Sequence, residues 1–330
     1  MYNSLIECIP NFSEGRDSKK IREITDSIEK INGVKLLHVD SGKDTNRTVV
    51  TFVGTPDAVC EATFNAIKTA AKIIDMREHY GKHPRIGSTD VCPLTPLRGI
   101  DMETTVEYAR KLAKRVGENL EIPVYCYEYA AFIPERKNLA FCRKGEYESL
   151  PKKLLMQKPD FGPNIFSHQV AKTGATIIGA RNFLIAVNFN LNTKLIEPAK
   201  KIASEIREKG NGAKLKGVKA IGWYIDDFGI AQVSVNITDI KSTPLHAVFD
   251  EVAKRAKAMN LCVTGTEIVG LIPEETMFEA GRYFLSKRKN HENAKKEFLI
   301  ETAIRELGLE NLSPFILNNK ILEYRMLDKN

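Results

Sequence analysis

Hydrophobic residues in the first part of the chain follow two patterns. Short apolar or β-branched runs are typical of strands, and longer stretches with a period near 3.6 are typical of helices. The runs predict strands at residues 5–10, 34–40 and 47–53. The periodic stretches predict helices at residues 18–31 and 56–74, and Pro56 suits the first turn of the second helix.

The second half of the chain repeats this order. We expect strands at residues 183–190, 218–225 and 230–237, and a further strand that begins at 261–263. Helices are expected at 195–207 and 244–259. The segment Asp226-Asp227-Phe228-Gly229 is typical of a hairpin turn between two of these strands.

Both halves therefore predict the order strand-helix-strand-strand-helix-strand of a ferredoxin-like unit. Helices would cover one face of each sheet and leave the other face in need of cover. We expect an α+β fold (an α/β sandwich) of two ferredoxin-like subdomains, residues 1–179 and 180–330. Their sheets would stack with the helices outside, and a ligand can lie in the seam.

Three segments lie outside this repeat. Residues 86–158 are expected to extend the first unit with a helix at 102–119, a strand at 123–127 and a helix near 146–156. Residues 160–179 are interpreted as a glycine-rich connection, and residues 291–307 as a terminal helix.

Composition excludes several classes of protein. The 330 residues are 43% hydrophobic and 28% charged, which is ordinary for a globular protein. No apolar run is long enough for a membrane span and the N-terminus lacks signal-peptide features, so we expect a soluble, cytoplasmic protein. The six cysteines have no close pairs, which favours reduced thiols over a zinc site. The net charge of +7 is spread over predicted helix faces and does not by itself indicate nucleic acid.

The densest polar cluster spans residues 79–90. Two histidines four apart, His79 and His83, can bind zinc from one helix face, but Gly81 and Pro84 oppose a helix there, and we expect no metal. His83 can instead act as a single acid–base group. In the same cluster Arg85 can hold a carboxylate, and Asp90 can orient an imidazole or pair with a cationic amidine. Loop capping is the alternative role for all three.

Two further polar patches lie at predicted turns. Residues 7–16, which include Asn11, follow the first strand, and their backbone N–H groups can bind an anion or simply cap a helix. The turn around residues 40–47 carries Asp40, Asn46 and Arg47, and turn chemistry explains part of it. Residues 160–181 resemble a phosphate loop in composition only, because neither GxxxxGK[ST] nor GxGxxG is present.

Several motifs, in order and in register, resemble those of one family. They are ECIPNFSEG at 7–15, TNRTV at 45–49, TFVG at 51–54, HPRIGSTDVCP at 83–93, GEYE at 145–148, DFGP at 160–163, GWY at 222–224 and AQVS at 231–234. The chain is similar to the glutamate formiminotransferase family, the transferase domain of formiminotransferase-cyclodeaminase, over nearly its whole length.

The resemblance implies transfer of the formimino group from N-formimino-L-glutamate to N5 of tetrahydrofolate, in histidine degradation. Tetrahydrofolate would be the co-substrate, held in a tunnel between the two sheets. The family's catalytic histidine falls on His83, and its folate-contacting loop on residues 162–174, where Thr173 replaces a tryptophan. The expected catalytic set is His83, Asp40, Arg85 and Asp90. The expected binding set is Gly162, Pro163, Gly174, Ala175, Asn11, Asn46 and Arg47.

The resemblance also implies partners. We expect a homodimer that binds formiminoglutamate and polyglutamylated folate, with no nucleic acid or membrane partner. Because the chain ends where bifunctional members continue, the product would pass to a separate cyclodeaminase. A formyltransferase that uses 5-formyltetrahydrofolate and glutamate remains an alternative. So do a folate-binding module without catalysis and an RNA-binding ferredoxin-like protein, although the last lacks the aromatic strand signature of that class.

Overall fold

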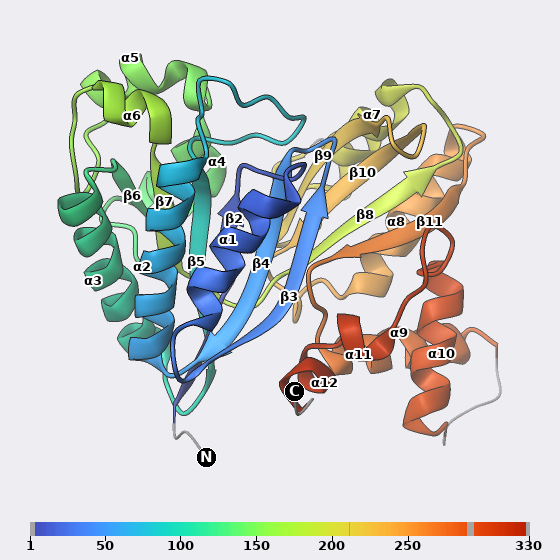
Figure 1. Ribbon diagram of the computed structural model, residues 1–330. Helices are drawn as coiled ribbons and strands as arrows, with labels where there is room; N and C mark the ends of the chain where they lie inside the picture. Colours follow the sequence, from blue (N-terminus) through green and yellow to red (C-terminus); the bar gives the residue numbers. More distant parts are fainter. Residues whose placement is uncertain (1–3, 211, 289–293, 328–330) are drawn as a thin grey trace. The chain divides into compact units, whose positions relative to one another are not determined.

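The computed structural model describes residues 4–210, 212–288 and 294–327 (Figure 1). The chain divides into two compact units, and the division lies after Asn182. Each unit has a mixed sheet-and-helix core with its own buried apolar cluster. Each is described separately below.

The first unit contains a ferredoxin-like core. Its elements are β1 (Leu5–Cys8), β2 (Asn11–Phe12), α1 (Ser18–Glu29), β3 (Val34–Gly42), β4 (Arg47–Gly54), α2 (Pro56–Ile73) and β5 (Thr89–Arg98). The strands lie in the order β3, β4, β1 with β2, and β5, and all these neighbours are antiparallel. Alternate strand residues such as Ile6 and Phe52 pack against Ile24 and Ile28 of α1 and against α2.

Further helices and two further strands follow in the first unit, and the strands extend the same sheet. They are α3 (Met102–Leu120), β6 (Val124–Glu128), η1 (Pro134–Lys137), α4 (Leu139–Arg143), η2 (Tyr147–Ser149), α5 (Leu150–Met156), α6 (His168–Thr173) and β7 (Thr176–Ala180). Strand β7 lies between β5 and β6 and is parallel to both. The expected helix at 102–119 and strand at 123–127 are confirmed within two residues.

Two strands of the first unit differ from the prediction. Residues 160–179 are not only a connection, because they contain α6 and β7. The ferredoxin-like order predicted a strand after the helix at 56–74 but assigned no residues to it. The structure forms β5 there, although Pro93 and Pro96 interrupt it and proline normally argues against an inner strand. Proline has no N–H to donate, but its carbonyl can still accept: the Ile9 N–H donates to the Pro93 carbonyl at 3.2 Å.

The second unit repeats the ferredoxin-like order. Its elements are β8 (Ile185–Leu191), α7 (Ile196–Ile206), β9 (Val218–Ile225), β10 (Ile230–Ile237), α8 (Leu245–Ala258) and β11 (Val263–Val269). The sheet order is β11, β8, β10, β9, with every pair antiparallel. The hairpin turn is confirmed: the Gly229 N–H donates to the Asp226 carbonyl at 3.1 Å, and Gly229 has a φ of 63°. The predicted fold class is therefore confirmed in both units.

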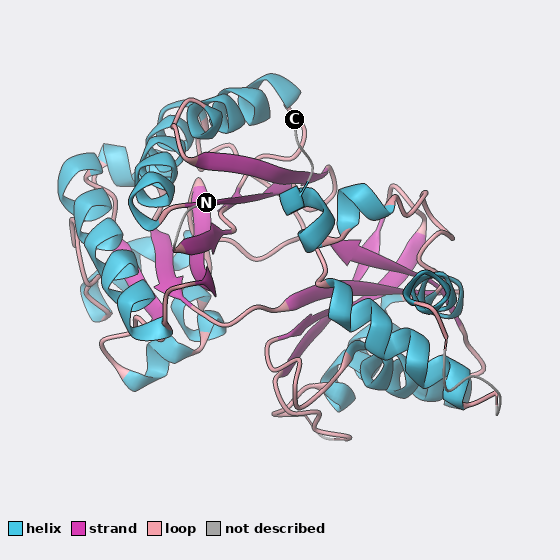
Figure 2. Ribbon diagram, turned by 90° about the horizontal axis from the view of Figure 1, so that it is seen from below, coloured by secondary structure: helices cyan, strands magenta, loops and turns pink. Residues whose placement is uncertain are grey.

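Helices complete the second unit. They are α9 (Glu274–Ser286), α10 (Lys296–Leu307), α11 (Leu317–Lys320) and α12 (Leu322–Leu327). Helix α9 was not predicted. The expected terminal helix at 291–307 begins at Lys296, and residues 291–293 lie outside the described part of the chain. Figure 2 separates the helices and strands of each unit by colour.

No helix among the residues described is both long and apolar enough to span a bilayer.

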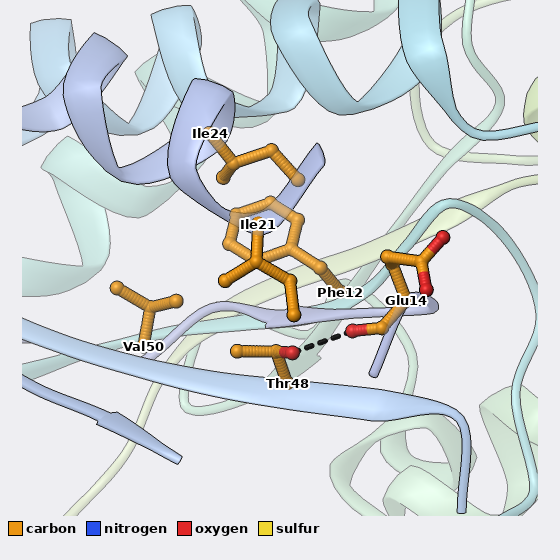
Figure 3. A pocket seen from close by; sticks show the side chains of 6 residues that line it. All are labelled: Phe12, Glu14, Ile21, Ile24, Thr48 and Val50. Carbon is orange, nitrogen blue, oxygen red and sulfur yellow. Dashed lines mark hydrogen bonds between the residues drawn. The ribbon is translucent and has the colours of Figure 1, made fainter. Parts of the chain in front are cut away.

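A narrow gap with no room for a water molecule lies between α1 and the sheet of the first unit. Figure 3 shows the side chains that line it, Phe12, Glu14, Ile21, Ile24, Thr48 and Val50. The Thr48 hydroxyl donates to the Glu14 carbonyl at its edge. Because the lining is mostly apolar and the gap is small, we interpret it as a feature of helix-on-sheet packing.

The loop before β7 is fastened to the segment before β5. The Ser88 N–H donates to the Thr173 carbonyl at 2.7 Å, and the Ala175 N–H donates to the Ile86 carbonyl at 3.1 Å. Gly174 lies between these bonds with a φ of 68° and a ψ of −155°, a conformation that essentially only glycine adopts. A Cβ at Gly174 would come within 2.4 Å of the Ile86 carbonyl oxygen.

We predict that Gly174→Ala lowers the free energy of unfolding by roughly 3 kcal/mol or more, because backbone strain and a steric clash add together. Urea unfolding measures this. The matched control is Gly270→Ala, where φ is 77° and no atom lies within 4 Å of a new Cβ. The control should cost only about 1–2 kcal/mol of backbone strain. Equal losses in the two variants would contradict the assigned clash.

Candidate functional site

A β-bulge places Asp90 at the centre of a polar cluster in the first unit. Asn11 pairs with Val91 and Phe12 pairs with Thr89, so Asp90 is the extra residue of β5 opposite β2. Bulges redirect a side chain relative to strict alternation and are common beside active sites. Asp90 is completely buried, with 0% of its surface exposed.

Two arginines from distant segments pair with the Asp90 carboxylate. Arg47, the first residue of β4, donates from Nη1 to Oδ2 at 2.7 Å. Arg143, the last residue of α4, donates from Nε to Oδ1 at 3.1 Å and from Nη2 to Oδ2. The Ile86 N–H also donates to Oδ1, at 3.1 Å. Burial alone would raise the pKa of Asp90, but Arg143 and Arg47 lower it to about 2.

His83 interacts electrostatically with the charged groups of this cluster. Burial, followed by the positive charges of Arg47 and Arg143, lowers the pKa of His83 well below 6.5, and Asp90 opposes this only in part. The Nδ1–H of His83 donates to the Pro84 carbonyl at 2.7 Å. Because a carbonyl can only accept, Nδ1 carries the proton of the neutral ring, and Nε2 is its basic nitrogen. His83 is therefore a neutral base at pH 7.

The arginines beside Asp90 retain unused donors. Arg47 donates from Nε to Asn11 Oδ1 at 3.1 Å and from Nη1 to Asp90, and no described residue accepts from its Nη2. Asn11 in turn donates from Nδ2 to the Ile9 carbonyl at 2.8 Å. Arg143 uses Nε and Nη2 for Asp90, and no described residue accepts from its Nη1. Two positive charges against one carboxylate leave a net charge of about +1 with free N–H groups, which suits an anion.

Arg85 lies in a different network, in which its N–H groups are already used. It donates from Nη1 and Nη2 to Glu148 at 2.8 Å and 2.6 Å, and from Nη1 to Glu146 at 3.2 Å. Its Nε donates to His79 Nδ1 at 3.1 Å, and its Nη2 also donates to the His79 carbonyl at 3.2 Å. All five donors of this guanidinium are engaged. Its expected grip on a substrate carboxylate stays a prediction that would require one of these bonds to exchange.

Both ring nitrogens of His79 are used by the protein. Nε2–H donates to the Asn46 carbonyl at 2.9 Å, and Nδ1 accepts from Arg85. Among the described residues, no group of three or more His, Cys, Asp or Glu is placed to hold a metal ion.

Asn46 and Asp40 lie around the β3–β4 turn. Asn46 has a φ of 45°, accepts from the Gly15 N–H at 2.9 Å and donates from Nδ2 to the Tyr80 carbonyl at 3.0 Å. It thus ties three segments together, and its expected contact with folate stays a prediction. Asp40 is half-buried on β3 opposite Val49, on the same sheet face as Arg47.

The expected folate loop is anchored at both ends. Gly162 has a φ of 83°, and a Cβ there would lie 2.2 Å from the Ile122 carbonyl oxygen. Pro163 next to it is half-buried, whereas Ala175 is only 1% exposed at the other end of the loop. The accessible part lies between these ends, where Ile165 is 71% exposed. Contacts of this loop with folate stay a prediction.

Sequence reasoning missed Arg143 and gave no role to the glutamates. Arg143 belongs to a short helix that the hydrophobic pattern did not predict. Glu146 and Glu148 lie in the GEYE motif at 145–148, which carried the family resemblance without an assigned function. Their partnership with Arg85 spans about sixty residues of sequence, as the 61- and 63-residue separations show.

Two family models match the chain. Residues 5–181 match the formiminotransferase domain, N-terminal subdomain, and residues 186–327 match the formiminotransferase domain. The resemblance drawn from the sequence motifs is therefore confirmed.

Curated relatives cover nearly the whole chain. The formimidoyltransferase-cyclodeaminase of Rattus norvegicus is 44% identical over 99% of this chain, which spans 60% of the rat protein. The glutamate formimidoyltransferase of Thermoplasma acidophilum is 45% identical over 86% of this chain and 92% of its own length. The glutamate formimidoyltransferase of Streptococcus pyogenes serotype M1 is 40% identical over 85% of this chain and 93% of its own length.

We predict that Arg143→Gln raises the pKa of His83, because the variant removes a positive charge that disfavours the imidazolium. An NMR titration of the His83 ring measures the shift. Arg143→Lys is the control, since it keeps the charge and should keep the pKa low. A pKa for His83 in Arg143→Gln no higher than in the parent would contradict the assigned coupling.

Proposed function

Because this chain belongs to the formiminotransferase family, we propose that it transfers the formimino group of N-formimino-L-glutamate to N5 of tetrahydrofolate. The observation that carries the chemistry is His83, a neutral imidazole with a defined basic nitrogen beside an arginine pair. The names of the relatives support the choice of substrates. The chain spans about 60% of the length of the bifunctional relatives, so only one of the activities in their name is proposed for it.

In the proposed reaction, N5 of tetrahydrofolate attacks the formimino carbon, and a new C–N5 bond forms. The bond between that carbon and the glutamate nitrogen then breaks. Nε2 of His83 accepts the proton lost by N5 and returns it to the departing glutamate nitrogen, so the histidine ends as it began. Because the pKa of His83 is low, its conjugate acid gives the proton up readily.

The two arginines beside Asp90 are proposed to bind a carboxylate of formiminoglutamate. Arg47 and Arg143 have N–H groups that no described residue uses, whereas those of Arg85 are all engaged. Residue type alone leaves Arg47 and Arg85 as equal candidates for this role. Asp90 would act by fixing both arginines and not by touching the amidine. Asp40 remains the carboxylate proposed for the cationic formimino group.

Further parts of the proposal rest on the family. Tetrahydrofolate would contact the loop at residues 162–174. Asn11 and Asn46 are also proposed to contact it. No metal is required for amidine transfer by an acid–base group. We also propose a cytoplasmic homodimer whose 5-formimino product is consumed by a cyclodeaminase.

We predict that purified protein converts formiminoglutamate and tetrahydrofolate into a 5-formimino product, and that His83→Ala lowers turnover by about two to four powers of ten. Acidification cyclises the product to the 5,10-methenyl form, whose near-ultraviolet absorbance is the readout. His246→Ala is the control, since His246 stacks on Tyr283 in the second unit and takes no part in the reaction. Activity only with 5-formyltetrahydrofolate and glutamate would replace the proposal with the formyltransferase.

We predict that the acid limb of kcat/KM lies below pH 6.5 and that the rate is flat from there to about pH 8. The reason is that burial and two arginines lower the pKa of His83, so the ring stays neutral until the solution is more acidic than its ordinary value. A pH–rate profile tests this. A limb centred at or above pH 6.5 would exclude His83, in this environment, as the base.

A further inference from the structure

His79 joins two segments of the first unit, one with the proposed base and one with an arginine proposed to bind the substrate carboxylate. Its ring donates from Nε2–H to the carbonyl of Asn46 at 2.9 Å, and Asn46 directly precedes Arg47. The main chain that follows His79 reaches His83 four residues later. His79 therefore lies where the turn before β4 meets the segment before β5.

The backbones of these two segments are in direct contact. The Lys82 N–H donates to the Asp44 carbonyl at 3.0 Å. Gly81 lies so close to the turn that a Cβ there would come within 2.2 Å of the Thr45 carbonyl oxygen. The turn and the segment can therefore separate only if these backbone contacts are lost as well.

The partners of His79 fix the direction of both its hydrogen bonds. The Asn46 carbonyl can only accept, so Nε2 carries a proton. The Arg85 Nε–H can only donate, and it donates to Nδ1 at 3.1 Å, so Nδ1 presents a lone pair. The ring is therefore neutral and in the Nε2–H tautomer. His83 is in the opposite tautomer, because its Nδ1–H donates to the Pro84 carbonyl.

The charges around His79 favour this neutral form. Burial lowers its pKa below 6.5, the bond to the Asn46 carbonyl opposes that effect, and the charge of Arg85 lowers the pKa further. Glu14 raises the pKa and Arg16 lowers it, both more weakly. A proton added to Nδ1 would face the N–H of Arg85, so the bond between these two side chains would be lost.

The conformation of Asn46 explains why the turn needs support. Its φ of 45° lies in the left-handed region, which residues other than glycine rarely adopt. Three hydrogen bonds hold it: the Gly15 N–H donates to its Oδ1, its Nδ2 donates to the Tyr80 carbonyl, and His79 donates to its own carbonyl. Arg47 follows directly, so relaxation of Asn46 would redirect the backbone of Arg47.

We propose that His79 is a positioning residue for the transfer reaction. As a neutral Nε2–H imidazole it holds Asn46 against the segment that carries His83, and so keeps Arg47 where it can bind the substrate carboxylate. His79 itself touches neither substrate. The inference rests on the proposed function, and it deepens that function by assigning the group that sets the spacing between the base and the carboxylate site.

The test compares His79→Phe with His79→Gln. Phenylalanine fills the space of the ring without either nitrogen, whereas the glutamine amide supplies one acceptor and N–H donors without charge. We expect His79→Phe to raise the KM for formiminoglutamate at least about tenfold, because a displacement of about 1 Å at a binding group can cost about a hundredfold. His79→Gln should stay within about threefold of the parent, because both bonds can form. Equal KM values in the two variants would overturn the proposal.

A second readout does not depend on the reaction. The charge of Arg47 lowers the pKa of His83, so displacement of Arg47 in His79→Phe should raise that pKa. His79→Gln should leave it as in the parent. NMR titration of the ring nitrogens measures the pKa, and the same spectra show which nitrogen carries the proton in each ring. A proton on Nδ1 of neutral His79 in the parent would overturn the proposal even if no variant folds.

His246→Phe is the matched control. His246 is also half-buried, but it lies in the second unit, where it stacks on Tyr283. The same substitution there should change neither the KM for formiminoglutamate nor the pKa of His83. A rise in KM equal to that of His79→Phe would reflect the loss of any half-buried histidine and would overturn the proposal.

Failure of the positioning role differs from failure of the proposed function. A parent that transfers the formimino group, with an unchanged KM in His79→Phe, would overturn the positioning role alone. A parent that transfers nothing would overturn the proposed function. The pKa of His83 in the two variants would then still decide whether His79 holds Arg47 in place.

Discussion

The buried ion-pair cluster of Arg47, Asp90 and Arg143 is the constraint on which the first unit's polar site depends. It joins the start of β4, the bulge of β5 and the end of α4, which are far apart in sequence. A charge removed from water is tolerated only when it is paired, and removing one partner of such a pair typically costs about 3–5 kcal/mol. The carboxylate therefore fixes two cations in place, and burial together with those cations lowers the pKa of His83 and keeps its ring neutral.

Arg85, two residues after His83, is the centre of a second hydrogen-bond network. Arg85 is held by Glu146, Glu148 and His79, and its donors are fully used. Arg47 and Arg85 are both buried, at 7% exposure each, yet one retains donors and the other does not. Residue type and burial do not separate a binding arginine from a structural one. The number of guanidinium N–H groups that already have an acceptor does separate them.

The two units have the same topology and carry different chemistry. Each has the strand order of a ferredoxin-like unit with an apolar face under helices. On the other face, the first unit gathers charged groups, whereas the second lines up an indole and two amides. The same strand pairing occurs in both units, and the side chains that the strands carry decide what each unit can bind.

The sequence by itself determined the ferredoxin-like order of both units, the family, and His83 as the candidate base. These follow from periodicity and from motifs that are continuous along the chain. It did not locate the residues of β5, because proline patterning argues against an inner strand, and it missed Arg143, because the short helix α4 has no periodic signature. Only the tertiary structure decided which charges meet. The bulge at Asp90 breaks the two-residue alternation from which sequence predicts orientation, and hydrogen bonds between residues forty to sixty positions apart leave no local pattern to read.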